Sequence, residues 1–307
     1  LQEAVQAYNR VIQLKPDFPD AYSNRGYALK DLDQLDEALK SCDKAIQLKP
    51  DFAEAHSNRG VALQELGRSK DAEASYRKAI ALKPDYAYVH FNLGTTLKEL
   101  GRLEETEASY RKAIALKPDY AEAHSNLGVM LRELGRSKDA EASYRKTIAL
   151  KPDYAKAHSN LGVTLQELGR SKDAEASFRQ AIAFKSDYAE AHNNLGNTLR
   201  DLGRLEEAEA SYRKAISLKP DYAEAHNNLG ITLRDLGRLE EAEASYRKAI
   251  ALKSDFAEAH SNLGVLLFIA KQYEKAAEQF KLSTFGESKY YLLRCLYLQD
   301  EKSLFFD

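Results

Sequence analysis

The chain has little of what marks a disulfide-rich, nucleic-acid-binding or membrane-spanning protein. Among its 307 residues are only two cysteines, Cys42 and Cys295, which lie near opposite ends. They argue against a disulfide framework and favour a reducing compartment such as the cytoplasm. The 45 basic and 47 acidic residues leave a net charge of −2, so no basic excess is present to follow a phosphate backbone. We therefore expect no nucleic acid as a partner.

Long apolar runs are also missing. No stretch approaches the ~20 apolar residues that a membrane-spanning helix needs, so no membrane is expected as a partner. The apolar content of 44% is nevertheless sufficient for a packed core. The chain begins at Leu1, without methionine and in the middle of a repeat, which predicts a fragment of a longer protein.

What the chain does contain is repetition. The tripeptide Lys-Pro-Asp recurs with a period of 34 residues, and Lys-Ser-Asp keeps the same register twice. The lysines of these tripeptides are Lys15, Lys49, Lys83, Lys117, Lys151, Lys185, Lys219 and Lys253. A fixed period of this length is typical of a solenoid, in which each unit contacts only its neighbours.

Residues 119–152 are the clearest copy of the unit. Asp119 and Glu122 predict a capping box at the start of a first helix, and Gly135 predicts its end. A first-helix face is predicted from His124, Leu127, Gly128, Leu131 and Leu134. A second helix is expected from about Ser137 to Leu150, with Ala140, Tyr144, Thr147 and Ile148 on its buried side and Pro152 beyond its end. The unit is thus a helical hairpin.

Three parts of this unit resemble the tetratricopeptide repeat (TPR), whose pattern is Trp-x-x-Leu-Gly-x-x-Tyr, then Ala-x-x-x-Phe, then Pro. They are His124-x-x-Leu127-Gly128-x-x-Leu131, Ala140-x-x-x-Tyr144 and Pro152. The match extends over nearly the whole chain. It implies an all-α fold: an α-solenoid that forms a right-handed TPR superhelix of helical hairpins, with the first helix of each pair on the concave face.

The repeat register divides the chain into three parts. Residues 1–16 match only the second helix of a truncated repeat, and residues 17–288 hold eight tandem units, the last of them divergent. Residues 289–307 predict one more apolar helix. It is either a terminal cap or the junction to a missing domain.

Two repeated residue types are interpreted as framework. The glycine of each first helix, for example Gly162, is expected to let two helix backbones approach closely. All seven histidines share one repeat position: His56, His90, His124, His158, His192, His226 and His260. One imidazole per repeat is too sparse for a metal site, so these side chains are predicted to be half-buried between helices. No phosphate loop or catalytic set stands out, so neither an enzyme nor a cofactor is expected here.

One asparagine per repeat is the best candidate for a binding function. The row comprises Asn24, Asn58, Asn92, Asn126, Asn160, Asn194, Asn228 and Asn262, of which Asn58 to Asn228 are the predicted peptide-binding residues. A carboxamide pairs with both the N–H and the C=O of a peptide backbone. The row resembles the asparagine ladder of the TPR superhelix in O-linked N-acetylglucosamine transferases, which holds the backbone of the substrate. The alternative is that the amides bond to neighbouring helices and only set the stacking.

Two departures from the repeat are sharper. In the third unit, Tyr88 and Phe91 replace polar residues of the predicted groove. Three explanations are open: a peptide anchor, a self-association contact or simple drift between repeats. In the last unit, Phe268 and Ile269 are expected to pack under the terminal helix at 290–298.

These patterns predict a protein-interaction scaffold that binds an extended peptide in its concave groove. The alternatives are the substrate-recruiting arm of a larger glycosyltransferase or oxygenase, and a self-assembly module. The lone helix at 1–14 leaves a face uncovered, so a homo-oligomer could form through the exposed ends of the solenoid.

Overall fold

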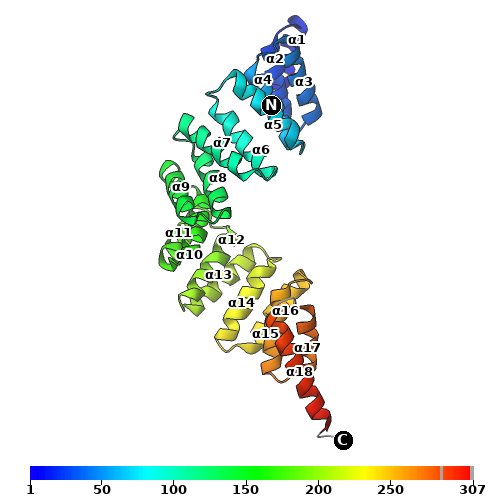
Figure 1. Ribbon diagram of the computed structural model, residues 1–307, viewed down its shortest axis with the longest axis vertical. Coiled ribbons are helices and arrows are strands. Elements are labelled where there is room, and N and C mark those ends of the chain that lie inside the picture. The colour runs from blue at the N-terminus through cyan, green and yellow to red at the C-terminus, as the bar shows by residue number, and fades with distance from the viewer. Residues whose placement is uncertain (284–285, 305–307) are drawn as a thin grey trace. The chain divides into compact units, whose positions relative to one another are not determined.

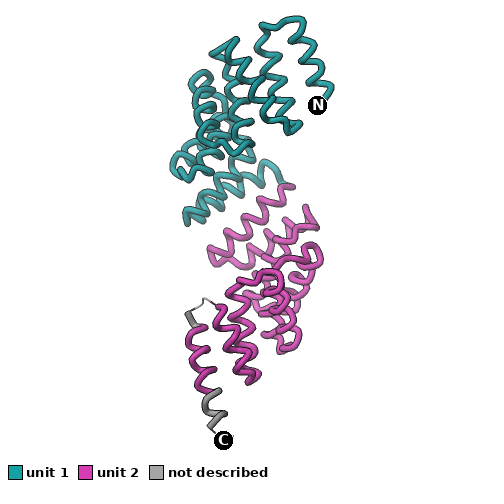
Figure 2. Tube along the Cα trace, turned by 90° about the vertical axis from the view of Figure 1, so that its right-hand side faces the viewer, with its two compact units in different colours: residues 1–152 teal, residues 153–307 magenta. Residues whose placement is uncertain are grey.

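The computed structural model describes residues 1–283 and 286–304, and within these ranges it contains eighteen α-helices and no strand (Figure 1). The chain divides into two compact units, residues 1–152 and residues 153–307 (Figure 2). Unit 1 contains α1 to α9 and unit 2 contains α10 to α18. We describe each unit by itself.

Unit 1 opens with α1 (Gln2–Leu14), which packs on the first of four hairpins. The first helices of these hairpins are α2 (Pro19–Lys30), α4 (Ala53–Glu65), α6 (Ala87–Glu99) and α8 (Ala121–Glu133). Their second helices are α3 (Leu35–Leu48), α5 (Ser69–Leu82), α7 (Leu103–Leu116) and α9 (Ser137–Leu150).

Unit 2 repeats the same arrangement. Its first helices are α10 (Ala155–Glu167), α12 (Ala189–Asp201), α14 (Ala223–Asp235) and α16 (Ala257–Ile269). Its second helices are α11 (Ser171–Phe184), α13 (Leu205–Leu218), α15 (Leu239–Leu252) and α17 (Tyr273–Leu282). The last helix, α18 (Gly286–Leu304), packs against α17.

The predicted second helix is confirmed: α9 spans Ser137–Leu150, and Ala140, Tyr144 and Thr147 are fully buried. Ile148 is only half-buried. The first helix ends at Glu133, one residue before the predicted Leu134, whose side chain is 39% exposed. Gly135 then takes a φ of +71°, the left-handed conformation that ends the helix.

The predicted capping box is wrong. Helix α8 begins at Ala121 with Tyr120 as its N-cap, and no side chain caps it. Asp119 therefore lies one residue too early to reach the free N–H groups of the first turn. Glu54, at this repeat position, pairs elsewhere, because its Oε1 lies 3.2 Å from the Nζ atom of Lys83, at the end of the second helix of the same hairpin.

From α4 to α16 the glycine of the first helix faces a ring rather than a backbone, whereas Gly26 of α2 faces the Sγ atom of Cys42. A Cβ atom added at Gly162 would lie 2.7 Å from Cε1 of Phe178, and one added at Gly196 would lie 2.6 Å from Cε1 of Tyr212. Both rings are fully buried. Contrary to the expectation from the sequence, the glycine therefore does not bring two backbones close together. Its missing side chain makes room for a ring of the second helix, which packs on the first helix.

Ion pairs link successive second helices. Arg102 places Nη1 2.7 Å from Glu73 and Nη2 2.6 Å from Glu105. Arg77 closes the ring, with Nε 2.8 Å from Glu73 and Nη2 2.9 Å from Glu105. Arg204 and Arg238 form the same bridges in unit 2. These ion pairs connect the second helices of successive hairpins within each unit.

Candidate functional site

The first helices of successive hairpins touch each other within each unit, and we call the surface that they form the inner face. In unit 1, α2 contacts α4 and α4 contacts α6; in unit 2, α10, α12, α14 and α16 are linked in the same way. The asparagines lie along it, and three of them, Asn58, Asn228 and Asn262, bond to the preceding first helix. Their exposure is graded: Asn24 is exposed, Asn92 is 8% exposed, and the rest are half-buried.

Several of these amides already serve the stacking. Asn58 Nδ2 donates to Oγ of Ser23 at 3.0 Å, in the preceding repeat. Asn228 Nδ2 donates to Oδ1 of Asn193 at 3.1 Å, and Asn262 Nδ2 donates to Oδ1 of Asn227 at 2.9 Å.

In unit 1, two further asparagines lie near buried tyrosines, Asn92 near Tyr76 and Asn126 near Tyr110. A carboxamide that makes one hydrogen bond to a neighbouring helix, as Asn58 does, keeps further donor and acceptor capacity, and the bond fixes its orientation. The structural and the binding interpretations are therefore compatible.

Two neighbouring repeats of unit 2 contain a second asparagine that the sequence analysis did not identify. Asn193 and Asn227 stand one residue before the row, where other units have serine or phenylalanine. They are 5% and 1% exposed, and each accepts the bond from the next asparagine of the row. The Asn-Asn dipeptides at 193–194 and 227–228 were the available signal.

Of the two predicted aromatic anchors, Tyr88 alone stays on the surface, with 45% of its side chain exposed. Phe91 is half-buried, and its ring centroid lies 5.7 Å from that of Tyr110 and 4.9 Å from that of Tyr120. Phe91 thus replaces a small residue by packing against the next repeat, which explains its presence without a ligand. The role of Tyr88 as an anchor stays a prediction.

Polar side chains at the ends of the first helices bond to the acid found 35 residues further on. Lys98 Nζ lies 2.8 Å from Oε1 of Glu133, and Gln64 Nε2 donates to Oε1 of Glu99 at 3.0 Å. The charge of Lys98 on this face is therefore paired inside unit 1.

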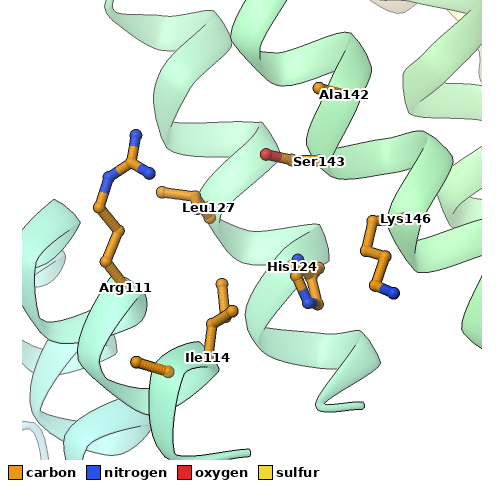
Figure 3. Close-up of a pocket in the computed structure, with 8 residues that line it drawn as sticks. Arg111, Ile114, His124, Leu127, Ala142, Ser143 and Lys146 are labelled. Atoms are coloured by element: carbon orange, nitrogen blue, oxygen red, sulfur yellow. The ribbon is translucent and has the colours of Figure 1, made fainter. Parts of the chain in front are cut away.

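The histidines lie on the opposite side, at the floor of hollows between successive second helices, which we call the outer hollows. One of about 350 Å³ is shown in Figure 3. It is lined by Arg111, Ile114 and Ala115 of α7, His124 and Leu127 of α8, and Ala142, Ser143 and Lys146 of α9. Equivalent hollows of about 400 and 380 Å³ lie beside His90 and His226.

These histidines are held by the framework. His124 Nε2 lies 3.0 Å from the carbonyl oxygen of Pro118, six residues earlier. Burial lowers the pKa of His124 and outweighs that hydrogen bond, so the ring is neutral at pH 7 and donates its Nε2 proton. Across residues 1–283 and 286–304, no three His, Cys, Asp or Glu side chains are placed to hold a metal ion.

The cysteine of unit 1 is buried. Cys42 is fully buried against α2, and burial raises the pKa of its thiol to about 12, which keeps it protonated. No described helix has the length and apolarity to cross a membrane.

The terminal helix α18 covers part of the last hairpin, as the sequence predicts. The ring of Phe268 lies 5.5 Å from Tyr291, and Tyr291 stacks on Phe280 at 5.5 Å. Ile269, in contrast, is 60% exposed, so its expected burial is wrong.

Comparisons with known proteins agree on one family. Models of the tetratricopeptide repeat match residues 119–187, 153–221 and 187–255, residues 53–86, residues 75–108 and residues 227–284. A further TPR model matches residues 1–33, 26–67 and 94–132. Together these matches extend over residues 1–284. A comparison with curated proteins found no match.

Solved structures support the same fold. MamA shares 26% identity with a TM-score of 0.51, over 54% of this chain and 97% of that chain. A chain of the APC/C hetero-tetramer Cut9–Hcn1 shares 16% identity with a TM-score of 0.63, over 86% of this chain and 52% of that chain. YrrB is described as a TPR protein with an unusual peptide-binding site. It shares 24% identity with a TM-score of 0.52, over 61% of this chain and 96% of that chain. At these identities, the last two show the all-α TPR fold alone.

Proposed function

Because the chain belongs to the tetratricopeptide-repeat family, we propose that it is a non-enzymatic protein-interaction scaffold whose inner face binds an extended segment of a partner protein. The observation that carries this proposal is the row of oriented carboxamides along the first helices of each unit. Three members of the row, Asn58, Asn228 and Asn262, are fixed by a donated bond.

The spacing of the row suits an extended backbone. Packed helices lie ~8–10 Å apart, and three extended residues span roughly 10 Å. One asparagine per hairpin would therefore meet about every third residue of the segment. Because the contacts are to the backbone, the row supplies affinity with little sequence preference, and Tyr88 would add a side-chain anchor in unit 1.

The test uses asparagines that do not support the stacking. Neither Asn160 nor Asn194 donates to a neighbouring helix, so replacing them with alanine should leave the core of unit 2 intact. Twelve-residue peptides would first be selected from a random phage-displayed library on the 307-residue chain. Their dissociation constants would then be measured by fluorescence anisotropy.

The double variant is expected to lose at least about thirtyfold in affinity, since four hydrogen bonds of at least ~0.5 kcal/mol each total about 2 kcal/mol or more. Asn9→Ala on α1 is the matched control, because Asn9 accepts its bond from Arg25 at 2.9 Å and lies outside the row. Selected peptides that bind the double variant as tightly as wild type would refute the asparagine row. Failure to select any peptide would refute the scaffold itself.

A further inference from the structure

Arg200, near the end of α12 in unit 2, is a half-buried arginine with no partner among the described residues. Its Nη1 atom is buried and makes no hydrogen bond. No described residue pairs with the rest of its guanidinium group, and Nε and Nη2 are not buried, so that edge reaches the surface. A partly buried, unpaired positive charge is costly and calls for an explanation.

Arg200 is unpaired because the acid at the matching position is an aspartate, whose side chain is one methylene shorter than a glutamate. Lys98 occupies the matching position in unit 1, and it pairs with Glu133, 35 residues further on. The residue 35 positions beyond Arg200 is Asp235. Asp235 instead accepts bonds from its own neighbour Arg234, at 3.1 Å from Nε and 3.0 Å from Nη2. Arg200 is thereby left without the carboxylate that its position has elsewhere.

Arg200 also lies on the inner face, beside the asparagine row. It follows Asn193 and Asn197 at intervals of seven and three residues on α12, which places all three on one side of the helix. Asn194 lies six residues earlier, about 9 Å along the axis. Long helical side chains lean toward the N-terminus, so the guanidinium points back toward the row.

The buried nitrogen fixes the guanidinium in place. Pairing it therefore costs little additional side-chain entropy. The accessible Nε and Nη2 form a side-on edge that matches a carboxylate with two parallel bonds. Such an edge recognises an acidic side chain better than an amide or a hydroxyl group.

We propose that Arg200 binds the carboxylate of an aspartate or glutamate in the segment held by the inner face of unit 2. The inference rests on the proposed scaffold function and adds a specificity to it. The row would hold the backbone, and Arg200 would select an acidic residue at one position.

The experiment repeats the selection from a random twelve-residue library on wild type and on Arg200→Gln. Arg234→Gln is the matched control, because it removes the same charge one repeat later from a guanidinium that Asp235 already neutralises. Peptides are then synthesised with glutamate or glutamine at the enriched position, and anisotropy gives their affinities. Circular dichroism melting checks that each variant is folded.

The wild-type pool is expected to be enriched in acidic residues at one position, and the Arg200→Gln pool is not. Arg200→Gln should weaken a glutamate peptide about ten- to a hundredfold, and Arg234→Gln should weaken it by less than about fivefold. The glutamine peptide should bind wild type and Arg200→Gln equally.

Three outcomes would overturn the proposal. A pool that depends on Asn160 and Asn194 but shows no acidic enrichment would refute the carboxylate position and leave the scaffold standing. Equal losses in both arginine variants would indicate general electrostatic attraction instead. A pool that ignores the asparagines would refute the inner face as the binding surface, and this inference with it.

Discussion

Replacing Tyr246 with phenylalanine is expected to leave the protein as stable as wild type or more stable, whereas the same change at Tyr212 is expected to destabilise it. The two side chains occupy the same position in neighbouring hairpins, and both are fully buried. Tyr212 donates its hydroxyl proton to Oδ1 of Asn197 at 2.7 Å. Tyr246 has no hydrogen-bond partner, because Ile231 stands where the previous repeat has Asn197.

The magnitudes follow from these environments. Tyr212→Phe removes one hydrogen bond, which costs ~0.5–1.5 kcal/mol. Tyr246→Phe removes a hydroxyl that was desolvated without compensation, a penalty of ~1–3 kcal/mol, and so should recover part of it. Packing is unaffected, since Phe178 fills the same position against Gly162 and is fully buried. A difference of about 2 kcal/mol between the two variants is expected.

Urea unfolding followed by circular dichroism would measure the two free energies of unfolding, and the double variant would test additivity. Because both sites lie in adjacent hairpins of unit 2, any uncoupling of the units affects them alike. Equal losses at the two positions would refute the reasoning, since they would show that the hydroxyl of Tyr246 is satisfied in solution. Ile231→Asn offers a second check, because it should supply the hydrogen-bond acceptor that the Tyr246 hydroxyl lacks. In that background, Tyr246→Phe should lower the free energy of unfolding as Tyr212→Phe does.

Two further predictions concern the framework. Gly162→Leu should lower the free energy of unfolding by ~1–3 kcal/mol, because its Cβ would overlap Phe178. Phe178→Leu in the same chain should recover part of the loss. An unchanged unfolding midpoint would contradict the placement of Gly162 against the ring. Acid should weaken the ion-pair rings. Burial would raise the pKa of Glu73, but hydrogen bonds from Arg77 and Arg102 outweigh it and lower the pKa, and the bond from Arg102 lowers that of Glu105. A lowered folded-state pKa stabilises at neutral pH, and this contribution is lost as pH falls below ~4.5. Melting temperatures between pH 6 and pH 3 should therefore fall less steeply for Arg102→Gln than for wild type.

The fold was predictable because the same residues recur in the same places. The second-helix bounds at Ser137 and Leu150, the left-handed glycine at Gly135 and the packing of Phe268 under α18 all followed from periodicity and helix chemistry. The capping box failed because an Asp-x-x-Glu pattern fixes spacing but does not fix where the first turn begins. The acid at Asp119 stays outside the helix.

The candidate site was only partly predictable. The asparagine row and its position on the first helices could be expected, yet its bonds to Ser23, Asn193 and Asn227 depend on how successive hairpins are offset. Arg200 could not be separated from the other basic residues of the face by sequence alone. Its isolation depends on the reach of Asp235, a difference of one methylene that only coordinates resolve.

The pairing at intervals of 35 residues has a consequence for how such a gene can change. Near-identical repeats recombine readily, and loss or duplication of a whole repeat would preserve the glycine–ring contacts inside the remaining hairpins. It would nevertheless give the inner-face cation at the new junction a different neighbour. Removing residues 221–254, for example, would place Ile269 in the position of Asp235 opposite Arg200. Binding preferences could thus be rewritten by unequal crossing-over, in whole-repeat steps, without a single point mutation.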